Sequence, residues 1–137
     1  MIKRSYIDAN LLIAAWKGDD EAGSAALAVL DDWERTLLVS DALWLEVMPK
    51  ATYEKKHGEM AFYQSIFERA EYHPWRLDVL RRAQELAQSY GIAAMDAIHV
   101  ATALAAGADE FISAEKPTKP MFRVREMHMI SLRGTVS

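Results

Sequence analysis

Short apolar segments alternate with longer helical patterns along this chain, and this alternation constrains its fold more than any other feature. The longer patterns place apolar residues three and four positions apart, which is the spacing of a helix with one buried face. Strands that alternate with helices form mainly parallel sheets, because each parallel connection needs a crossover helix. The sequence therefore predicts an α/β domain with a small, mainly parallel sheet.

Capping and helix-breaking residues set the bounds of the predicted elements. Ser40 or Asp41 should cap a brief helix that Pro49 ends, and Gly91 and Gly107 should end two later helices. The predicted strands are Ile2–Ile7, Thr36–Val39, Phe111–Ser113 and Met129–Leu132. The predicted helices are Leu11–Ala15, Ala22–Trp33, Asp41–Val47, Tyr53–Tyr72, Val79–Tyr90 and Met95–Ala106.

Length and composition indicate one domain in a reducing compartment. The chain has 137 residues, 51% of them hydrophobic, which suits a single domain over residues 1–137. It has no cysteine, so disulfides, thiolate metal sites and cysteine nucleophiles are excluded. Asp8 and Asn10 interrupt the apolar stretch near the N-terminus, and no run approaches the roughly 18 apolar residues of a membrane span. We expect a cytoplasmic protein with no membrane partner.

The charge is acidic overall but unevenly distributed. A net charge of −4 argues against a general nucleic-acid binder, which is usually basic. Residues 17–34 are rich in acids, whereas residues 116–137 carry five bases and a single acid. The basic segment is either a local footprint for a polyanion or an ordinary solvated surface.

Four acidic residues fall at the places where an open parallel sheet gathers its functional groups. Such sheets bind ligands beyond the carboxyl ends of their strands. Asp8 and Glu115 each follow a predicted strand, Glu46 lies in the short helix after the second strand, and Asp96 opens the apolar helix 95–106. Burial of Asp96 without a partner would be costly, which makes it the most informative of the four. Each acid also has a structural interpretation: Asp8 and Asp96 fit helix caps, and Glu46 and Glu115 fit solvated positions.

Other polar and aromatic residues near these acids have two interpretations each. Asn10 and Ser113 could support an acidic site, or could cap a helix and end a strand. His99 follows Asp96 by one helical turn, and we expect a packed histidine that makes one structural bond. The four tryptophans, at helical spacing, are expected mostly in the core, with base stacking as the alternative. The candidate phosphate contacts are Lys116, Lys119, Arg123 and Arg125.

The order of these segments resembles the PIN domain, and among PIN domains the VapC-type toxins of prokaryotic toxin–antitoxin pairs. The resemblance spans the chain from Ile2 to about Leu132, and its most specific part is the segment Asp96–Ala101. It is carried by Tyr6–Asn10, Glu46, Met95–Ala103 and Asp109–Glu115, in that order.

The resemblance implies a three-layer α/β/α fold and a metal-dependent endoribonuclease. In this family, acids coordinate Mg²⁺ or Mn²⁺ for RNA hydrolysis, and the matching residues are Asp8, Glu46, Asp96 and Glu115. The chemistry is reasonable, because crowded carboxylates repel one another and hard divalent cations with oxygen ligands relieve that repulsion. Without these four acids the chain has 16 acidic and 16 basic residues, so its whole net charge could reside in the site. The resemblance also implies a small antitoxin partner and a homodimer.

Two departures from the family pattern keep an alternative open. The family usually has serine or threonine after the first aspartate, where this chain has Ala9, and an aspartate at the position of Glu115. The alternative function is therefore a PIN fold that has lost catalysis and binds RNA or protein. A dehalogenase-type phosphatase also begins with a strand that ends in aspartate, but it requires a second aspartate where this chain has Asn10.

Overall fold

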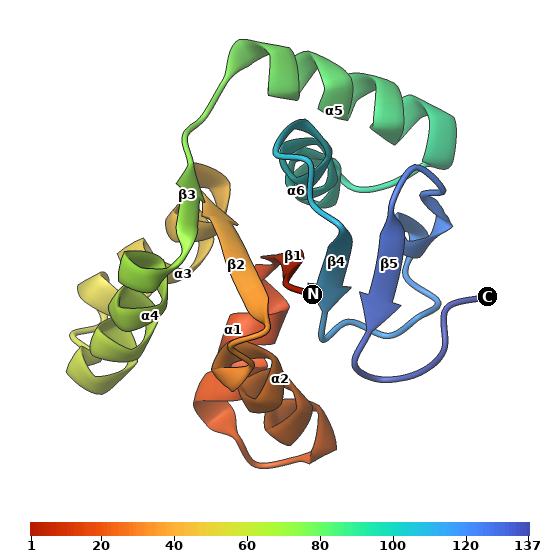
Figure 1. Ribbon diagram of the computed structural model, residues 1–137. Helices are drawn as coiled ribbons and strands as arrows, with labels where there is room; N and C mark the ends of the chain where they lie inside the picture. Colours follow the sequence, from red (N-terminus) through yellow and green to blue (C-terminus); the bar gives the residue numbers. More distant parts are fainter.

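Five strands form one sheet in which every neighbouring pair is parallel, so the predicted mainly parallel sheet is confirmed. The computed structural model that shows this describes residues 1–137 (Figure 1). The strand order is β3-β2-β1-β4-β5, with the first strand at the centre. The strands are β1 (Lys3–Ile7), β2 (Arg35–Ser40), β3 (Glu71–His73), β4 (Glu110–Ser113) and β5 (His128–Ser131).

Six α-helices and one 3-10 helix cover the two faces of this sheet. They are α1 (Ala9–Lys17), α2 (Glu21–Asp31), α3 (Asp41–Tyr53), α4 (His57–Arg69), α5 (Leu77–Tyr90), α6 (Ala94–Ala105) and η1 (Pro120–Arg123). Side chains from α1, α2, α3 and α4 share one buried cluster with the sheet, and those from α5, α6 and η1 share the other. The sheet is therefore the middle layer of an α/β/α arrangement, as predicted. None of the helices is both long and apolar enough to cross a membrane.

The alternation of side chains along the strands separates the two cores. Ile7 and Val39 point into the cluster under α1 to α4, whereas Tyr6 and Leu38 point into the cluster under α5 and α6. All four side chains are fully buried, as is expected of central strands with helices on both faces.

The order of the strands reverses direction between β1 and β4. From β1 the chain adds β2 and then β3 on one side, and it then returns across the sheet to place β4 on the other side of β1. The covering helices change face at the same step, from α1–α4 to α5–α6. Ligands of open parallel sheets bind beyond the carboxyl ends of the strands at such a reversal. Asp8 follows β1 and Glu115 lies two residues after β4, so both stand at this reversal.

The elements differ from the predicted ones in the segment from Pro49 to His73. Helix α3 continues through Pro49 to Tyr53, where we predicted that it would end at the proline. The carbonyl that loses its donor belongs to Leu45, which is exposed to solvent, so the break in hydrogen bonding is tolerated. The next helix begins at His57 rather than Tyr53, and the short edge strand β3 lies where the prediction had only the end of a helix.

The tryptophans are exposed, so their predicted place in the core is wrong. Trp33 is 93% exposed and lies in the turn after α2, beyond the end of the helix in which we expected it. Trp16, Trp44 and Trp75 are each more than 40% exposed. Smaller aliphatic residues at adjacent helical positions fill the core instead, for example Leu12 beside Trp16.

Candidate functional site

Asp8 is a buried carboxylate at the carboxyl end of the central strand. Its Oδ1 accepts a hydrogen bond from the Leu11 backbone amide at 3.1 Å, so it also caps α1. Burial raises the pKa of Asp8 to about 6, although the Ser113 hydroxyl and the Leu11 amide act in the opposite direction. The nearby charge of Asp96 adds to the increase. The protein itself therefore leaves the negative charge of Asp8 only partly compensated.

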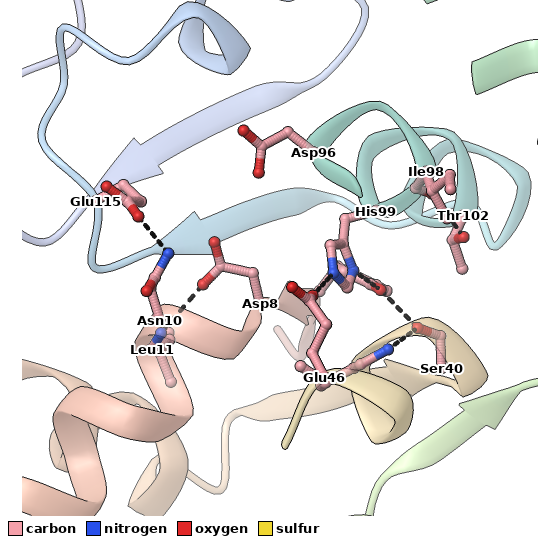
Figure 2. Close-up of polar contacts among 12 residues, drawn as sticks. Asp8, Asn10, Leu11, Ser40, Glu46, Asp96, Ile98, His99, Thr102 and Glu115 are labelled. Carbon is pink, nitrogen blue, oxygen red and sulfur yellow. Dashed lines mark hydrogen bonds and ion pairs between the residues drawn. The ribbon is translucent and has the colours of Figure 1, made fainter. Parts of the chain in front are cut away.

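Asp96 and Glu115 share a single cationic partner. The Lys119 ammonium lies 3.6 Å from Asp96 Oδ2 and 3.5 Å from Glu115 Oε1. Partial burial lowers the pKa of Lys119, but the two carboxylates outweigh this effect and the net shift is upward. Figure 2 shows the Asp8, Asp96 and Glu115 carboxyl groups turned toward a common space. One positive charge is therefore already drawn between two of the candidate acids.

Asp96 does not cap α6. The N-cap of this helix is Ala93, no side chain bonds to the free amides at its start, and Asp96 lies in its first turn. The cap interpretation of Asp96 is therefore wrong, and its carboxylate is free to act outside the helix. Its position in the first turn is still electrostatically favourable, because the amino end of a helix carries partial positive charge.

Asn10 and Ser113 both contact residues of the candidate acidic site. The Asn10 side-chain amide donates a hydrogen bond to Glu115 Oε1 (Figure 2). The Ser113 hydroxyl is fully buried and accepts a hydrogen bond from the Glu115 backbone amide at 3.0 Å. The same hydroxyl lowers the pKa of Asp8. These two residues thus connect the loop after β4 to the start of α1.

The fourth candidate acid, Glu46, contacts a buried histidine. His99 is 2% exposed, and its Nε2 contacts Glu46 Oε1 while its Nδ1 lies 2.7 Å from the Tyr6 hydroxyl. We expected a packed histidine with one structural bond, whereas His99 makes two, and one of them is to a candidate ligand. The spacing of one helical turn from Asp96 was the available sequence signal for this contact.

The donor set suits a hard divalent cation, although no three of the side chains lie close enough together to share one. Carboxylate oxygens are the preferred ligands of Mg²⁺ and Mn²⁺. No group of three or more histidine, aspartate or glutamate side chains lies close enough together to hold a metal ion. The incompletely neutralised Asp8 and the lysine between Asp96 and Glu115 both indicate a space that attracts positive charge. The residues fit the cation in chemistry and require the carboxylates to close around it.

The candidate phosphate contacts are dispersed. Lys119 lies at the acids, and Lys116 is exposed one residue after Glu115. Arg123 donates a hydrogen bond to the Tyr90 carbonyl at 2.9 Å, which directs its guanidinium toward the end of α5. The Arg125 guanidinium reaches the Ser137 carbonyl at 3.5 Å. Of the four, only Lys119 contacts the acids.

Two hollows flank α1 beside the candidate acids. One has a volume of about 380 Å³ and is lined by Asn10, Glu115 and Arg133 among others. The other has a volume of about 230 Å³ and includes Glu46 and the half-exposed Trp16. Both hollows also include Lys17. Space for an extended ligand is therefore present on both sides of the helix that begins at Asp8.

Several solved structures of toxin–antitoxin proteins have the same fold. A toxin–antitoxin complex from Klebsiella pneumoniae matches with a TM-score of 0.62 and 27% identity over 81% of this chain and 86% of that chain. VapBC2 from Rickettsia felis, bound to a DNA fragment from its promoter, matches with a TM-score of 0.69 and 16% identity over 92% and 96%. VapC20 of Mycobacterium tuberculosis, a toxin that cleaves the sarcin–ricin loop, matches with a TM-score of 0.64 and 12% identity over 78% and 86%.

The comparison with family models decides the classification. None of the curated proteins matches this chain. The model of the PIN domain matches residues 5–116, which include Asp8, Glu46, Asp96 and Glu115. The match covers most of the chain, from within β1 to just past β4, so this chain belongs to the PIN domain family.

Proposed function

We propose that this chain is a metal-dependent endoribonuclease, and that it is the toxin of a toxin–antitoxin pair. The observation that carries the proposal is that three carboxyl groups, from Asp8, Asp96 and Glu115, are turned toward one space at the carboxyl edge of the sheet (Figure 2). These groups come from three segments that lie far apart in the sequence. The match to the PIN family and the fold shared with VapC toxins support the same function.

In the proposed mechanism the acids of this chain hold Mg²⁺ or Mn²⁺. Asp8 would supply a carboxylate from the end of β1 and Asp96 one from α6, while Glu115 would add the longer side chain after β4 and Glu46 one from α3. A bound divalent cation of this kind activates water and stabilises charge on a phosphate. Asn10 orients Glu115 through its amide, and the Lys119 ammonium supplies positive charge beside the acids for a phosphate oxygen. Lys116, Arg123 and Arg125 are proposed to contact the RNA farther along.

The proposed partner in the cell is a small antitoxin. The structure of the Klebsiella pneumoniae complex, 27% identical to this chain, is that of a toxin together with its antitoxin. A partner of this kind would keep a ribonuclease from acting until it is released. The homodimer implied by the family resemblance stays a prediction, which sedimentation of the purified protein would test.

The decisive experiment is RNA cleavage with a matched pair of variants. Wild type is incubated with a pool of structured RNAs that includes transfer RNAs, in Mn²⁺, in Mg²⁺ or in EDTA. We expect cleavage in either metal, none in EDTA, and at least a hundredfold loss of rate in Asp96→Asn, because removal of a ligand charge weakens metal binding. Asp31→Asn is the control, since it makes the same change at an exposed acid of α2 outside the site.

Two results would contradict the proposal in different ways. Cleavage that persists in EDTA or in Asp96→Asn would exclude these acids as the metal site. A folded wild type that binds RNA and metal but cuts nothing would favour a binding module, which is the alternative that Ala9 and Glu115 leave open. Substitution of Glu115 by aspartate then separates the two functions, because a gain of cleavage would assign the loss to the longer side chain.

A further inference from the structure

A chain of four buried or partly buried polar side chains leads from the sheet to Glu46. The Ser40 hydroxyl lies 2.7 Å from the Tyr6 hydroxyl, which lies 2.7 Å from His99 Nδ1. His99 Nε2 contacts Glu46 Oε1 (Figure 2). Ser40, Tyr6 and His99 are each at most 2% exposed. Such an enclosed chain of hydrogen bonds is costly to leave incomplete, so each donor and acceptor requires a partner.

The directions of these hydrogen bonds follow from the groups at the two ends. Glu46 is an acceptor when ionised, so the proton between it and the imidazole belongs to His99 Nε2. In a neutral ring Nδ1 is then an acceptor, and the Tyr6 hydroxyl must be its donor. The Tyr6 oxygen in turn accepts from Ser40, whose oxygen accepts the Leu43 backbone amide at 3.1 Å. Every group in the chain is satisfied in this one direction.

The Tyr6 hydroxyl is held in place between Ser40 and His99. Its ring stacks on Phe111 of the neighbouring strand with centroids 5.4 Å apart, which fixes the direction of the hydroxyl. The orientation of the phenol is therefore fixed by the stacked ring and by its two hydrogen-bond partners.

This series of hydrogen bonds also connects the elements that carry three of the candidate acids. Tyr6 lies two residues before Asp8, and His99 lies one helical turn after Asp96. Ser40 caps α3, the same helix that presents Glu46. A shift of β1, α3 or α6 relative to the others would break at least one of these hydrogen bonds.

We infer that Tyr6 and His99 are positioning residues that hold Glu46 by one carboxylate oxygen and leave the other, Oε2, for the metal ion. The inference rests on the proposed function, because it assigns Glu46 a metal. A carboxylate fixed in this way loses less side-chain freedom when a cation binds, and hydrogen-bonded partners of ligands commonly contribute ten- to hundredfold to metal affinity. His99 thus acts through Glu46 rather than as a ligand.

The first test reads the proton on the imidazole directly. Nitrogen NMR of the metal-free protein at neutral pH, with the His99 signals assigned through the loss of peaks in His99→Gln, distinguishes the two ring nitrogens. We expect the proton on Nε2 and none on Nδ1. A proton on Nδ1, in a neutral ring or in an imidazolium, would overturn the inferred direction of the chain.

The second test is Mn²⁺ affinity, measured by calorimetry without RNA. We expect about tenfold weaker binding in His99→Leu, a smaller loss in Tyr6→Phe, and affinity near that of wild type in His99→Gln, whose amide can donate from the position of Nε2. Glu46→Gln shows how much Mn²⁺ affinity is lost when the carboxylate itself is removed. Circular dichroism checks that each variant is folded. If His99→Leu does not fold, Tyr6→Phe alone decides, because it removes only one hydroxyl.

The outcomes separate this inference from the proposed function. If wild type binds no Mn²⁺, the proposed function fails and the inference fails with it. If wild type binds Mn²⁺, Asp96→Asn does not, and both His99→Leu and Tyr6→Phe equal wild type, then only the inference is overturned. Equal losses in His99→Gln and His99→Leu would also overturn it, since they would show that the donor to Glu46 is not what matters.

Discussion

Two buried carboxylates at opposite ends of the sheet differ in whether cationic side chains compensate their charge. Glu110 begins β4 and is 1% exposed, and it accepts hydrogen bonds from the Ser5 hydroxyl and from the Arg35 guanidinium at 2.7 Å. Lys3 lies 3.7 Å from its other oxygen. Asp8 follows β1 at the opposite end and is 4% exposed, but no lysine or arginine forms an ion pair with it.

The difference indicates which of the two carboxylates is structural. Hydrogen bonds and cationic partners offset much of the desolvation cost of a buried charge, and removal of one partner is then strongly destabilising. A buried charge without such partners opposes folding, and its pKa rises, as that of Asp8 does to about 6. The amino end of the sheet therefore supplies its own cations, whereas the carboxyl end leaves room for an external one.

The largest expected effect is a gain of stability in Asp8→Asn without metal. The raised pKa of Asp8 means that the native state holds its proton more tightly than the unfolded chain, whose ordinary value is 3.8. The free energy of unfolding therefore falls as pH rises from about 4 to about 6 and stays low above that. The shift corresponds to about 3 kcal/mol, because each pKa unit is about 1.4 kcal/mol.

Urea unfolding in EDTA over this pH range measures the effect. The asparagine keeps an oxygen for the Leu11 amide, so the cap of α1 remains and only the charge is lost. We expect the difference between variant and wild type to grow as pH rises through this window. A difference that stays constant with pH would show that the charge of Asp8 is already compensated, and would break the comparison with Glu110.

The opposite sign is expected for Glu110→Gln. This change removes the acceptor charge from Arg35 and Lys3 and leaves an amide facing the guanidinium. Loss of a partner from a buried hydrogen-bonded charge should reduce the free energy of unfolding by about 2 kcal/mol. The unfolding midpoint at neutral pH measures it, and unchanged Mn²⁺ affinity in the same variant would show that the two ends of the sheet act independently.

Bound metal should offset the destabilisation that the uncompensated charge of Asp8 causes. With Mn²⁺ at ten times its dissociation constant, a ligand that binds only the native state adds about 1.4 kcal/mol to the free energy of unfolding. We expect a corresponding rise in the melting temperature of wild type and a much smaller one in Asp96→Asn. An equal rise in both proteins would place the metal elsewhere.

The sequence predicted the fold well because its signals were local and strong. Apolar strands such as Phe111–Ser113 and capped helices such as α2 were recognisable from their own residues. Strand β3 was not, because Glu71, Tyr72 and His73 pair at the edge of the sheet and are not buried in the core. Its partner strand, rather than its own composition, makes it a strand.

The candidate site was predicted only as a set of positions. The order of the acids and the rule for parallel sheets placed Asp8 and Glu115 at one edge, but neither could show that His99 holds Glu46. That contact joins residues 53 positions apart and depends on the packing of α3 against α6. The exposed tryptophans were also missed, because helical spacing does not tell which of two apolar neighbours faces the core.

The smallest expected effect concerns Lys119, whose ammonium contacts Asp96 and Glu115. Its ammonium lies between Asp96 and Glu115, so it competes with a metal ion for the same carboxylates. Because Lys119 is partly exposed and the pair is screened, we expect Lys119→Met to tighten Mn²⁺ binding by less than fivefold, which is under about 1 kcal/mol. Lys116→Met removes an exposed charge nearby and should leave the affinity unchanged. Weaker Mn²⁺ binding in Lys119→Met would mean that the lysine organises the acids instead of competing for them, and the carboxyl end would then resemble the compensated cluster around Glu110.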